Sequence, residues 1–305
     1  MDYRVRASLG AAVGFAAIAL GLTPAAQQVP TDGKSWTGHA PKGVRDPNLP
    51  PDEDAAKEQL AKSTMRSEWV DVKMATGQAI KTFIVHPVLT TLRPRGGVVI
   101  VVHDDLGLTD WVRGVADQLA RHNFIAVAPD LLSGKGPTGG GTDTLGAQVG
   151  QAIQALTLDE VTARLNAVRE YAVKIPTGTG SVATAGFGWG GGMSFNYALR
   201  QPQLNGALSF YGPISTDPAA YANPRVRIMG LFGSADPEIN ANIPIAQATL
   251  GNLFTPHVYI NATHGFMRLQ KEQNGENLNA VILAWPEAIS FLSGVTGGGG
   301  RGGGA

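Results

Sequence analysis

Short apolar strands alternate with amphipathic helices along most of this chain, and that alternation limits the folds open to it. Residues 98–102 form a continuous β-branched run, which is typical of a strand buried on both faces. Residues 110–122 follow with apolar side chains at helical spacing, and residues 124–128 form a second buried run. Regular alternation of this kind favours a mostly parallel sheet with helices on both faces. The sequence therefore predicts an α/β fold.

The other predicted elements continue this order through the globular part of the chain. An antiparallel pair of strands opens it, and a helix closes it. The further strands are expected at residues 69–74, 80–86, 182–187, 207–211, 226–232 and 257–260, and the further helices at residues 158–172, 190–199 and 279–292.

The first 26 residues are predicted to be a secretory signal peptide. Arg4 and Arg6 lie in a short charged start, an uncharged apolar run covers residues 7–22, and the small residues Ala25 and Ala26 follow. The apolar run is shorter than the roughly 20 residues of a membrane span. We therefore expect cleavage near Ala25 or Ala26, a secreted or periplasmic protein, and no stable membrane association after cleavage. An uncleaved N-terminal anchor is the alternative.

Composition sets the remaining boundaries and excludes some partners. Residues 27–66 are expected to be a polar leader, with a short helix over residues 52–63, and residues 67–294 an α/β domain. Residues 295–305 are mostly glycine and are predicted to be a disordered tail. The 24 basic and 24 acidic residues cancel, so no basic field indicates nucleic acid as a partner. The histidines lack ligand spacing, and we expect neither metal nor cofactor.

Polar or glycine-rich residues follow four of the predicted strands at the point where each strand ends. In parallel sheets these carboxyl ends share one edge, where binding sites form. The order along the chain is a glycine turn, then an aspartate, then a histidine, which is the order of the triad in α/β-hydrolases. The residues are His103, Asp104, Asp105 and Leu106, then 186–191, then Asp236, then His264 and Arg268.

This combination resembles the dienelactone hydrolase family, also called carboxymethylenebutenolidases, over residues 68–292. The resemblance implies the α/β-hydrolase fold and a small lactone, ester or carboxylate as the ligand. The motifs that carry it are Gly186-Phe187-Gly188-Trp189-Gly190-Gly191, Gly233-Ser234-Ala235-Asp236 and His264-Gly265-Phe266.

The resemblance also assigns a role to each of these positions. It implies that Asp236 and His264 are catalytic and that Arg268 helps to hold a substrate carboxylate. Asp104 takes the place of a glutamate that partners the resting thiol in the family, and we place it in the substrate site. Backbone N–H groups of Trp189 and of the loop at Asp105 or Leu106 are expected to form an oxyanion hole.

The position of the family's nucleophile falls on Gly188, which has no side chain. The whole chain contains no cysteine, so no thiol elsewhere replaces it. Glycine adopts a positive φ without the Cβ penalty and so relaxes a turn that is strained in active relatives. A binding protein gains from that change, whereas a nucleophilic enzyme loses its attacking atom. We predict catalysis that is impaired or absent.

Alternatives remain at the level of the sequence. His264 could activate a water directly, or Asp104, Asp105 or Ser194 could substitute for the nucleophile, although Ser194 lies about one turn into the predicted helix. A different class of function is dinucleotide binding, because Gly186, Gly188 and Gly191 also fit G-x-G-x-x-G. That function requires an acidic residue at the end of the next strand, and residues 207–211 contain none.

Overall fold

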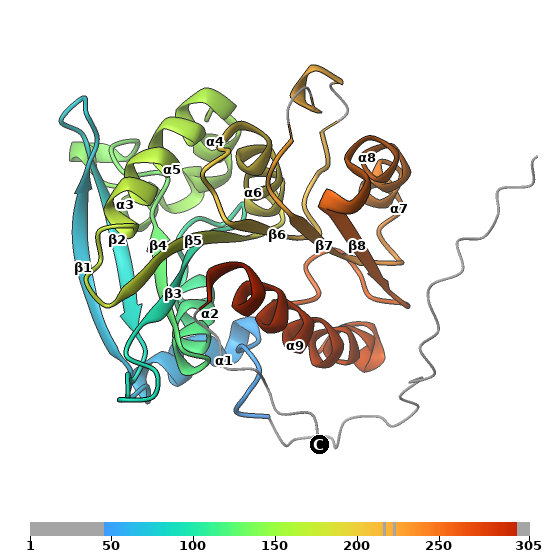
Figure 1. Ribbon diagram of the computed structural model, residues 1–305, viewed down its shortest axis with the longest axis horizontal. Helices are drawn as coiled ribbons and strands as arrows, with labels where there is room; N and C mark the ends of the chain where they lie inside the picture. The colour runs from blue at the N-terminus through green and yellow to red at the C-terminus, as the bar shows by residue number, and fades with distance from the viewer. Residues whose placement is uncertain (1–45, 216–217, 222–223, 298–305) are drawn as a thin grey trace, which may run out of the picture. The chain divides into compact units, whose positions relative to one another are not determined.

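The computed structural model describes residues 46–215, 218–221 and 224–297, and its core is one eight-stranded sheet (Figure 1). The strand order is β1-β2-β4-β3-β5-β6-β7-β8. β2 is antiparallel to β1 and to β4, and all the other neighbouring strands are parallel. The predicted α/β class with a mostly parallel sheet is confirmed. The strands are β1 Arg66–Lys73, β2 Ala79–His86, β3 Gly96–Val102, β4 Phe124–Pro129, β5 Gly178–Phe187, β6 Gly206–Phe210, β7 Ile228–Gly233 and β8 Phe254–Tyr259.

Helices cover both faces of the sheet (Figure 1). α2 and α9 pack on one face, and α5, α6 and α8 pack on the other. The helices are α1 Glu53–Ala61, α2 Asp110–Arg121, α3 Thr142–Leu145, α4 Val149–Gln154, α5 Leu158–Ala172, α6 Trp189–Arg200, α7 Pro237–Asn240, α8 Ile243–Leu250 and α9 Glu276–Thr296.

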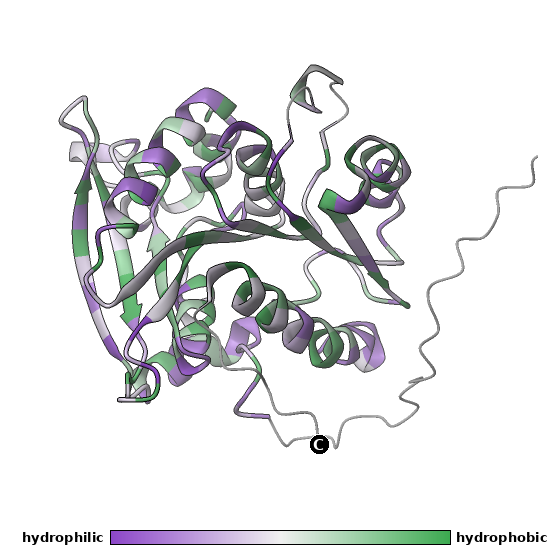
Figure 2. Cartoon of the chain, viewed as in Figure 1, coloured by the Kyte–Doolittle hydropathy of each residue, from purple (hydrophilic) through white to green (hydrophobic). Residues whose placement is uncertain are grey.

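The central strand β3 shows why the apolar runs are continuous. Val99 and Val101 pack into the core beneath α2 and α9, whereas Val98 and Ile100 pack into the core beneath α5 and α6. All four side chains are fully buried, because successive residues of a strand point to opposite faces. In Figure 2 the central strands are accordingly mostly hydrophobic. The buried sheet is a rigid base for the loops at its carboxyl edge.

The segment before β1 packs on the domain, although the sequence placed it in a polar leader. Asp52 caps α1 by accepting a hydrogen bond from the Ala55 N–H at 2.9 Å, and Ala56 is buried against α2. The Trp111 indole N–H donates to the Pro51 carbonyl at 2.9 Å. The ordered domain therefore begins before the predicted boundary at residue 67.

The end of the domain also differs slightly from the prediction. α9 continues through Thr296, whose side chain is buried, so the helix extends two residues into the predicted glycine-rich tail. The predicted signal peptide, residues 27–45 of the leader and residues 298–305 of the tail lie outside the described residues.

Helix α9 is long and apolar and packs on the sheet. With the turn before it, it is the one helix within the described ranges that has the length and composition of a membrane span. Its buried residues, including Val281, Trp285 and Leu292, contact the core beneath β3, β5, β6 and β7. The buried face of α9 is therefore part of the core, whereas Leu283 on the same helix is exposed.

Candidate active site

A sharp glycine turn joins β5 to α6 at the carboxyl edge of the sheet. Gly188 lies between the last residue of β5 and the first of α6, at φ +52° and ψ −120°. A side chain rarely adopts this conformation, and glycine does so without steric cost. Two residues on, a Cβ at Gly190 would overlap the carbonyl of His103. The lack of side chains therefore lets the start of α6 lie directly against the end of β3.

Two loops at the same edge bring Asp236 and His264 together. Asp236 follows β7 and His264 follows β8, and His264 Nδ1 forms a hydrogen bond to Asp236 Oδ2 at 2.7 Å. Asp236 is mostly buried, whereas 52% of the His264 side chain is exposed. The Ala235 N–H donates to the Ala262 carbonyl at 2.9 Å and so fixes the two loops to each other.

The other ring nitrogen of His264 faces the glycine turn. A Cβ built on Gly188 would lie 3.5 Å from His264 Nε2, which is an ordinary van der Waals separation. The place above Gly188 is therefore open to a small side chain and is within reach of the imidazole. The structure thus brings Gly188, Asp236 and His264 together, as the sequence analysis expected.

Asp104 forms another wall of the same space. Its Cβ would lie 3.8 Å from a Cβ at Gly188, and its side chain is almost fully buried. Asp104 Oδ1 accepts a hydrogen bond from the Leu106 N–H at 3.0 Å. Burial raises the pKa of Asp104 to about 6, although the Leu106 N–H and the Arg268 charge act in the opposite direction. The Leu106 N–H, one of the expected oxyanion-hole donors, is thus already paired with this carboxylate.

Arg268, expected to hold a substrate carboxylate, is paired within the chain. Its Nε lies 3.3 Å from Asp104 Oδ2, and its Nη1 lies 2.7 Å from Glu53 Oε2. The Glu53 N–H also donates to the Arg268 carbonyl at 3.0 Å. Sequence reasoning did not identify Glu53, because it is 215 residues away along the chain.

Two further residues that the sequence analysis did not single out hold His264 in place. Tyr211 follows β6 at φ +40°, and its ring centroid lies 5.1 Å from that of His264. Burial raises the Tyr211 pKa well above its ordinary value, so the phenol stays neutral. Asn277, in the first turn of α9, accepts from the Thr263 N–H at 3.0 Å and donates to the Leu269 carbonyl at 2.9 Å. Tyr211 could have been predicted as a site residue because it directly follows a strand, whereas nothing in the sequence around Asn277 indicates its contacts.

His103 and Ser194 are structural residues in this arrangement. His103 is fully buried, accepts the Leu131 N–H at 3.1 Å, and contacts the Asp104 carbonyl through Nδ1 at 2.9 Å. Burial lowers its pKa, and its ring stacks on Trp189. Ser194 is buried within α6 and forms a hydrogen bond with Thr184 at 2.6 Å. It is therefore shielded from any substrate and cannot replace a nucleophile at Gly188.

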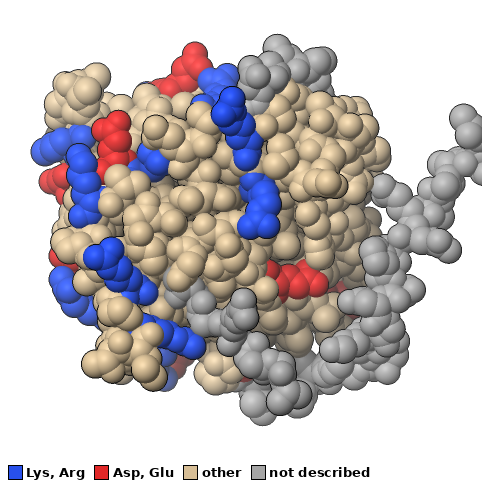
Figure 3. Space-filling model, in the orientation of Figure 1, with Lys and Arg blue, Asp and Glu red and all other residues tan. Residues whose placement is uncertain are grey.

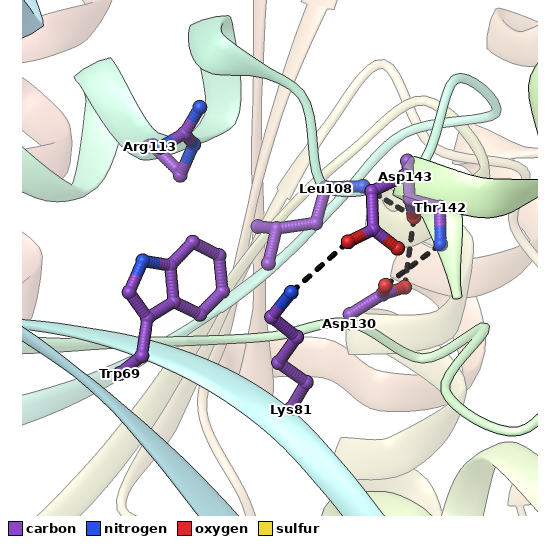
Figure 4. Close-up of a pocket in the computed structure, with 7 residues that line it drawn as sticks. All are labelled: Trp69, Lys81, Leu108, Arg113, Asp130, Thr142 and Asp143. Atoms are coloured by element: carbon purple, nitrogen blue, oxygen red, sulfur yellow. Dashed lines mark hydrogen bonds and ion pairs between the residues drawn. The ribbon is translucent and has the colours of Figure 1, made fainter. Parts of the chain in front are cut away.

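A separate pocket of about 210 Å³ lies beside β1 and β2 (Figure 4). Lys81 pairs with Asp143 at 3.0 Å, and the Thr142 hydroxyl donates to Asp130 at 2.8 Å. Lys81, Asp143 and Asp130 therefore all have partners within the chain. The pocket is not lined by Gly188, Asp236 or His264. Its lining residues are Trp69, Lys81, Leu108, Arg113, Asp130, Thr142 and Asp143.

Nucleic acid, metal ions and a dinucleotide were also considered as ligands in the sequence analysis. On the face shown in Figure 3, charged side chains lie dispersed among uncharged residues. Within the described residues, no group of three or more His, Asp or Glu side chains could hold a metal ion. β6 ends at Phe210 and is followed by Tyr211, so the acid that a dinucleotide ribose requires is absent there.

Comparisons with known proteins agree with this geometry. A sequence model of the dienelactone hydrolase family matches residues 80–296. A carboxymethylenebutenolidase homologue of Xenopus tropicalis is 27% identical over 208 residues, which cover 63% of this chain and 78% of that protein. Relatives from Methylorubrum extorquens and Escherichia coli are 27% and 26% identical over 52% and 47% of this chain. The alignments span only 58% and 55% of those two relatives.

Solved structures share the fold. A dienelactone hydrolase from Anabaena variabilis superposes with a TM-score of 0.60 at 17% identity, over 77% of this chain and 100% of that one. A dienelactone hydrolase-like promiscuous phosphotriesterase from metagenomic libraries gives a TM-score of 0.62 at 19% identity, over 76% and 99% of the two chains. The predicted α/β-hydrolase fold is thereby confirmed.

Proposed function

Because the chain belongs to the dienelactone hydrolase family, we propose that its site binds a small carboxylic ester or lactone without forming an acyl-enzyme. One observation carries this proposal: the Asp236–His264 pair faces Gly188, which has no side chain to activate. We propose that Gly188 occupies the position from which the family's nucleophile attacks. The pair that would assist such a nucleophile is retained, and the attacking atom is missing.

The binding part of the proposal is supported by the groups around Gly188. The N–H groups of Trp189 and Asp105 lie at the start of α6 and in the loop after β3, where they can stabilise a carbonyl oxygen. Sites that lack triad members still accelerate hydrolysis by roughly 10³- to 10⁴-fold over water through such donors. Slow turnover of an activated ester is therefore compatible with the loss of the nucleophile.

A second candidate function is hydrolysis by water that His264 activates directly. It is favoured by the open space between Gly188 and His264 Nε2. In this reaction Nε2 takes a proton from water, the resulting hydroxide attacks the ester carbonyl, and the imidazolium returns the proton to the leaving alkoxide. His264→Ala would abolish this activity, whereas the weak background from the oxyanion donors alone would persist.

Hydrolysis of short p-nitrophenyl esters and of dienelactone tests the proposal, with the unsubstituted protein compared with Gly188→Cys and Gly188→Ser. We expect the unsubstituted protein to show no pre-steady-state burst and no reaction with serine-hydrolase or thiol probes. A burst of p-nitrophenol equal to the protein concentration in the unsubstituted protein, together with the mass increase of an acyl group on the protein, would contradict it, since an acyl-enzyme gives both signals.

We also propose that residues 1–26 direct export and are removed. The proposal is supported by the charged start, the short apolar run and the small residues that follow it. Intact-mass analysis of the protein from an exporting host tests it. A mature chain starting near Gln27 is expected, and retention of Met1 with the apolar run would favour an anchor instead.

A further inference from the structure

The cations of the loop that follows His264 form ion pairs with residues at the start of α1. Arg268 contacts Glu53 at 2.7 Å, in addition to Asp104 at 3.3 Å. Lys271, the next cation in the same loop, contacts Asp54 at 2.9 Å and Asp52 at 3.4 Å. The first turn of α1 therefore supplies a carboxylate to each cation of the loop that follows His264.

The charges around the site leave a negative balance. Asp104 interacts electrostatically with both Asp105 and Glu53, and the guanidinium of Arg268 contacts Asp104 and Glu53. A carboxylate on a ligand would meet like charges there, and it would compete with Glu53 for Arg268. Like-charge contacts of this kind act against the wrong ligand and so give specificity.

Glu53 is held in this position by its backbone as well as by its side chain. Its N–H donates to the Arg268 carbonyl at 3.0 Å, and the Asp52 cap fixes the start of α1. Pro50 and Pro51, just before the helix, accept hydrogen bonds from Gln270 and Trp111 at 3.1 Å and 2.9 Å. The Glu53 side chain itself is 48% exposed, so Glu53→Gln can be made without opening the core.

We infer that Glu53 is a specificity-determining residue, which cancels the charge of Arg268 and makes the site select uncharged esters and lactones over those that bear a carboxylate. This inference rests on the proposed binding of an ester or lactone at Gly188. By this inference α1, which precedes the sheet in the chain, determines whether the site prefers an uncharged or a charged ligand.

The test uses two matched ligand pairs at pH 7.5. γ-Butyrolactone and its 5-carboxylate are titrated into the full-length protein, and binding is followed by the imidazole NMR signals of His264. p-Nitrophenyl hexanoate and mono-p-nitrophenyl adipate, which have acyl chains of equal length, are then compared by kcat/KM in the Gly188→Cys variant. We expect a preference for the uncharged member of about tenfold, as for one like-charge contact at a partly buried site.

Glu53→Gln should reduce that preference at least about threefold, mainly by strengthening interaction with the carboxylate. The control is Asp54→Asn, which removes a charge from the same helical turn but leaves the Arg268 pair intact. It should leave the preference unchanged. Equal effects of the two substitutions, or a preference of the parent protein for the carboxylates, would overturn the inference.

The two readouts separate this inference from the proposed function. If Gly188→Cys remains inactive while the His264 signals report the charge preference and its loss in Glu53→Gln, the proposed position of the nucleophile fails and the inference stands. If Gly188→Cys hydrolyses both esters and Glu53→Gln does not alter their ratio, the inference fails alone. If no ligand shifts the His264 signals and Gly188→Cys is inactive, both fail.

Discussion

Two halves of the candidate site differ in how their polar groups are satisfied. In the open half, formed by Gly188, Asp236 and His264, the imidazole is oriented by Asp236, and its other nitrogen faces open space. In the paired half, formed by Asp104, Arg268 and Glu53, each charged group contacts another within the chain. The open half is thus an oriented imidazole beside an unfilled space, whereas the paired half is a network of ion pairs.

This difference between the halves shows where the chain departs from the site that its family motifs predict. The open half brings Asp236 and His264 beside the glycine turn, and under the proposed function only the attacking atom is lacking. In the paired half, Arg268, which was expected to help hold a substrate carboxylate, contacts Glu53 of α1. Substitutions in the two halves should therefore change different properties. A nucleophile added to the open half should restore ester hydrolysis, whereas removal of a charge from the paired half should change the electrostatics of the site.

The largest effect is expected from Gly188→Cys, which should raise esterase kcat/KM by about 10² to 10⁴ because a positioned nucleophile and base act as a unit. The new thiol would be the only cysteine of the chain, so alkylation with loss of activity reports on it alone. Adding His264→Ala should remove most of the gain. Steady-state hydrolysis of p-nitrophenyl acetate measures each step.

Gly180→Cys is the matched control for that experiment. Gly180 also has a positive φ, at +84°, and no atom lies within 4 Å of a Cβ placed there. Its thiol should be alkylated without any gain in esterase activity. A similar gain in esterase activity in both variants would show that an exposed thiol alone suffices. The positions of Asp236 and His264 would then not explain the activity of Gly188→Cys.

In the paired half, Asp104→Asn should change the pH dependence of stability by about 2–3 kcal/mol, at 1.36 kcal/mol per pKa unit. The pKa of Asp104 is raised from 3.8 to about 6, so the folded protein retains a proton that the unfolded chain has lost. The parent therefore loses stability from this group as pH rises from about 4 to 7. Asparagine cannot titrate, and its variant should gain relative to the parent over that window.

Urea unfolding of both proteins at pH 4, 5.5 and 7 measures the difference in unfolding free energy. A flat difference for Asp104→Asn would mean that the paired half stabilises the ionised carboxylate fully, contrary to the effect of its burial.

The smallest effect is expected from Gly188→Ala, which should lower the free energy of unfolding by about 1 kcal/mol. The cost comes from a side chain at φ +52°, since the nearest atom to its Cβ would be 3.5 Å away. Gly190→Ala should cost several times more, because its Cβ would overlap a backbone carbonyl. Thermal and urea unfolding of the two variants compares them. If the two variants lost the same free energy of unfolding, steric overlap and not backbone strain would be the main penalty for a side chain at position 188.

The sequence by itself predicted the eight strands of a mostly parallel sheet and the placement of the open half, but it did not predict the helices α3, α4, α7 and α8. Continuous β-branched runs such as residues 98–102 identify strands buried on both faces, and parallel strands align their carboxyl ends at one edge. Asp236 and His264 each follow such a strand, so their positions could be inferred from local pattern alone. The positive φ at Gly188 followed from the same turn.

Only the tertiary structure decided the paired half and the true start of the domain. The contact of Glu53 with Arg268 joins residues 215 apart, and no local pattern encodes a pair at that separation. Residues 46–62 have a polar composition that favours a leader, but a few buried groups such as Ala56 and the Pro51 carbonyl attach them to α2. Local propensity depends on neighbours in sequence, whereas these contacts depend on which surfaces the finished fold brings together.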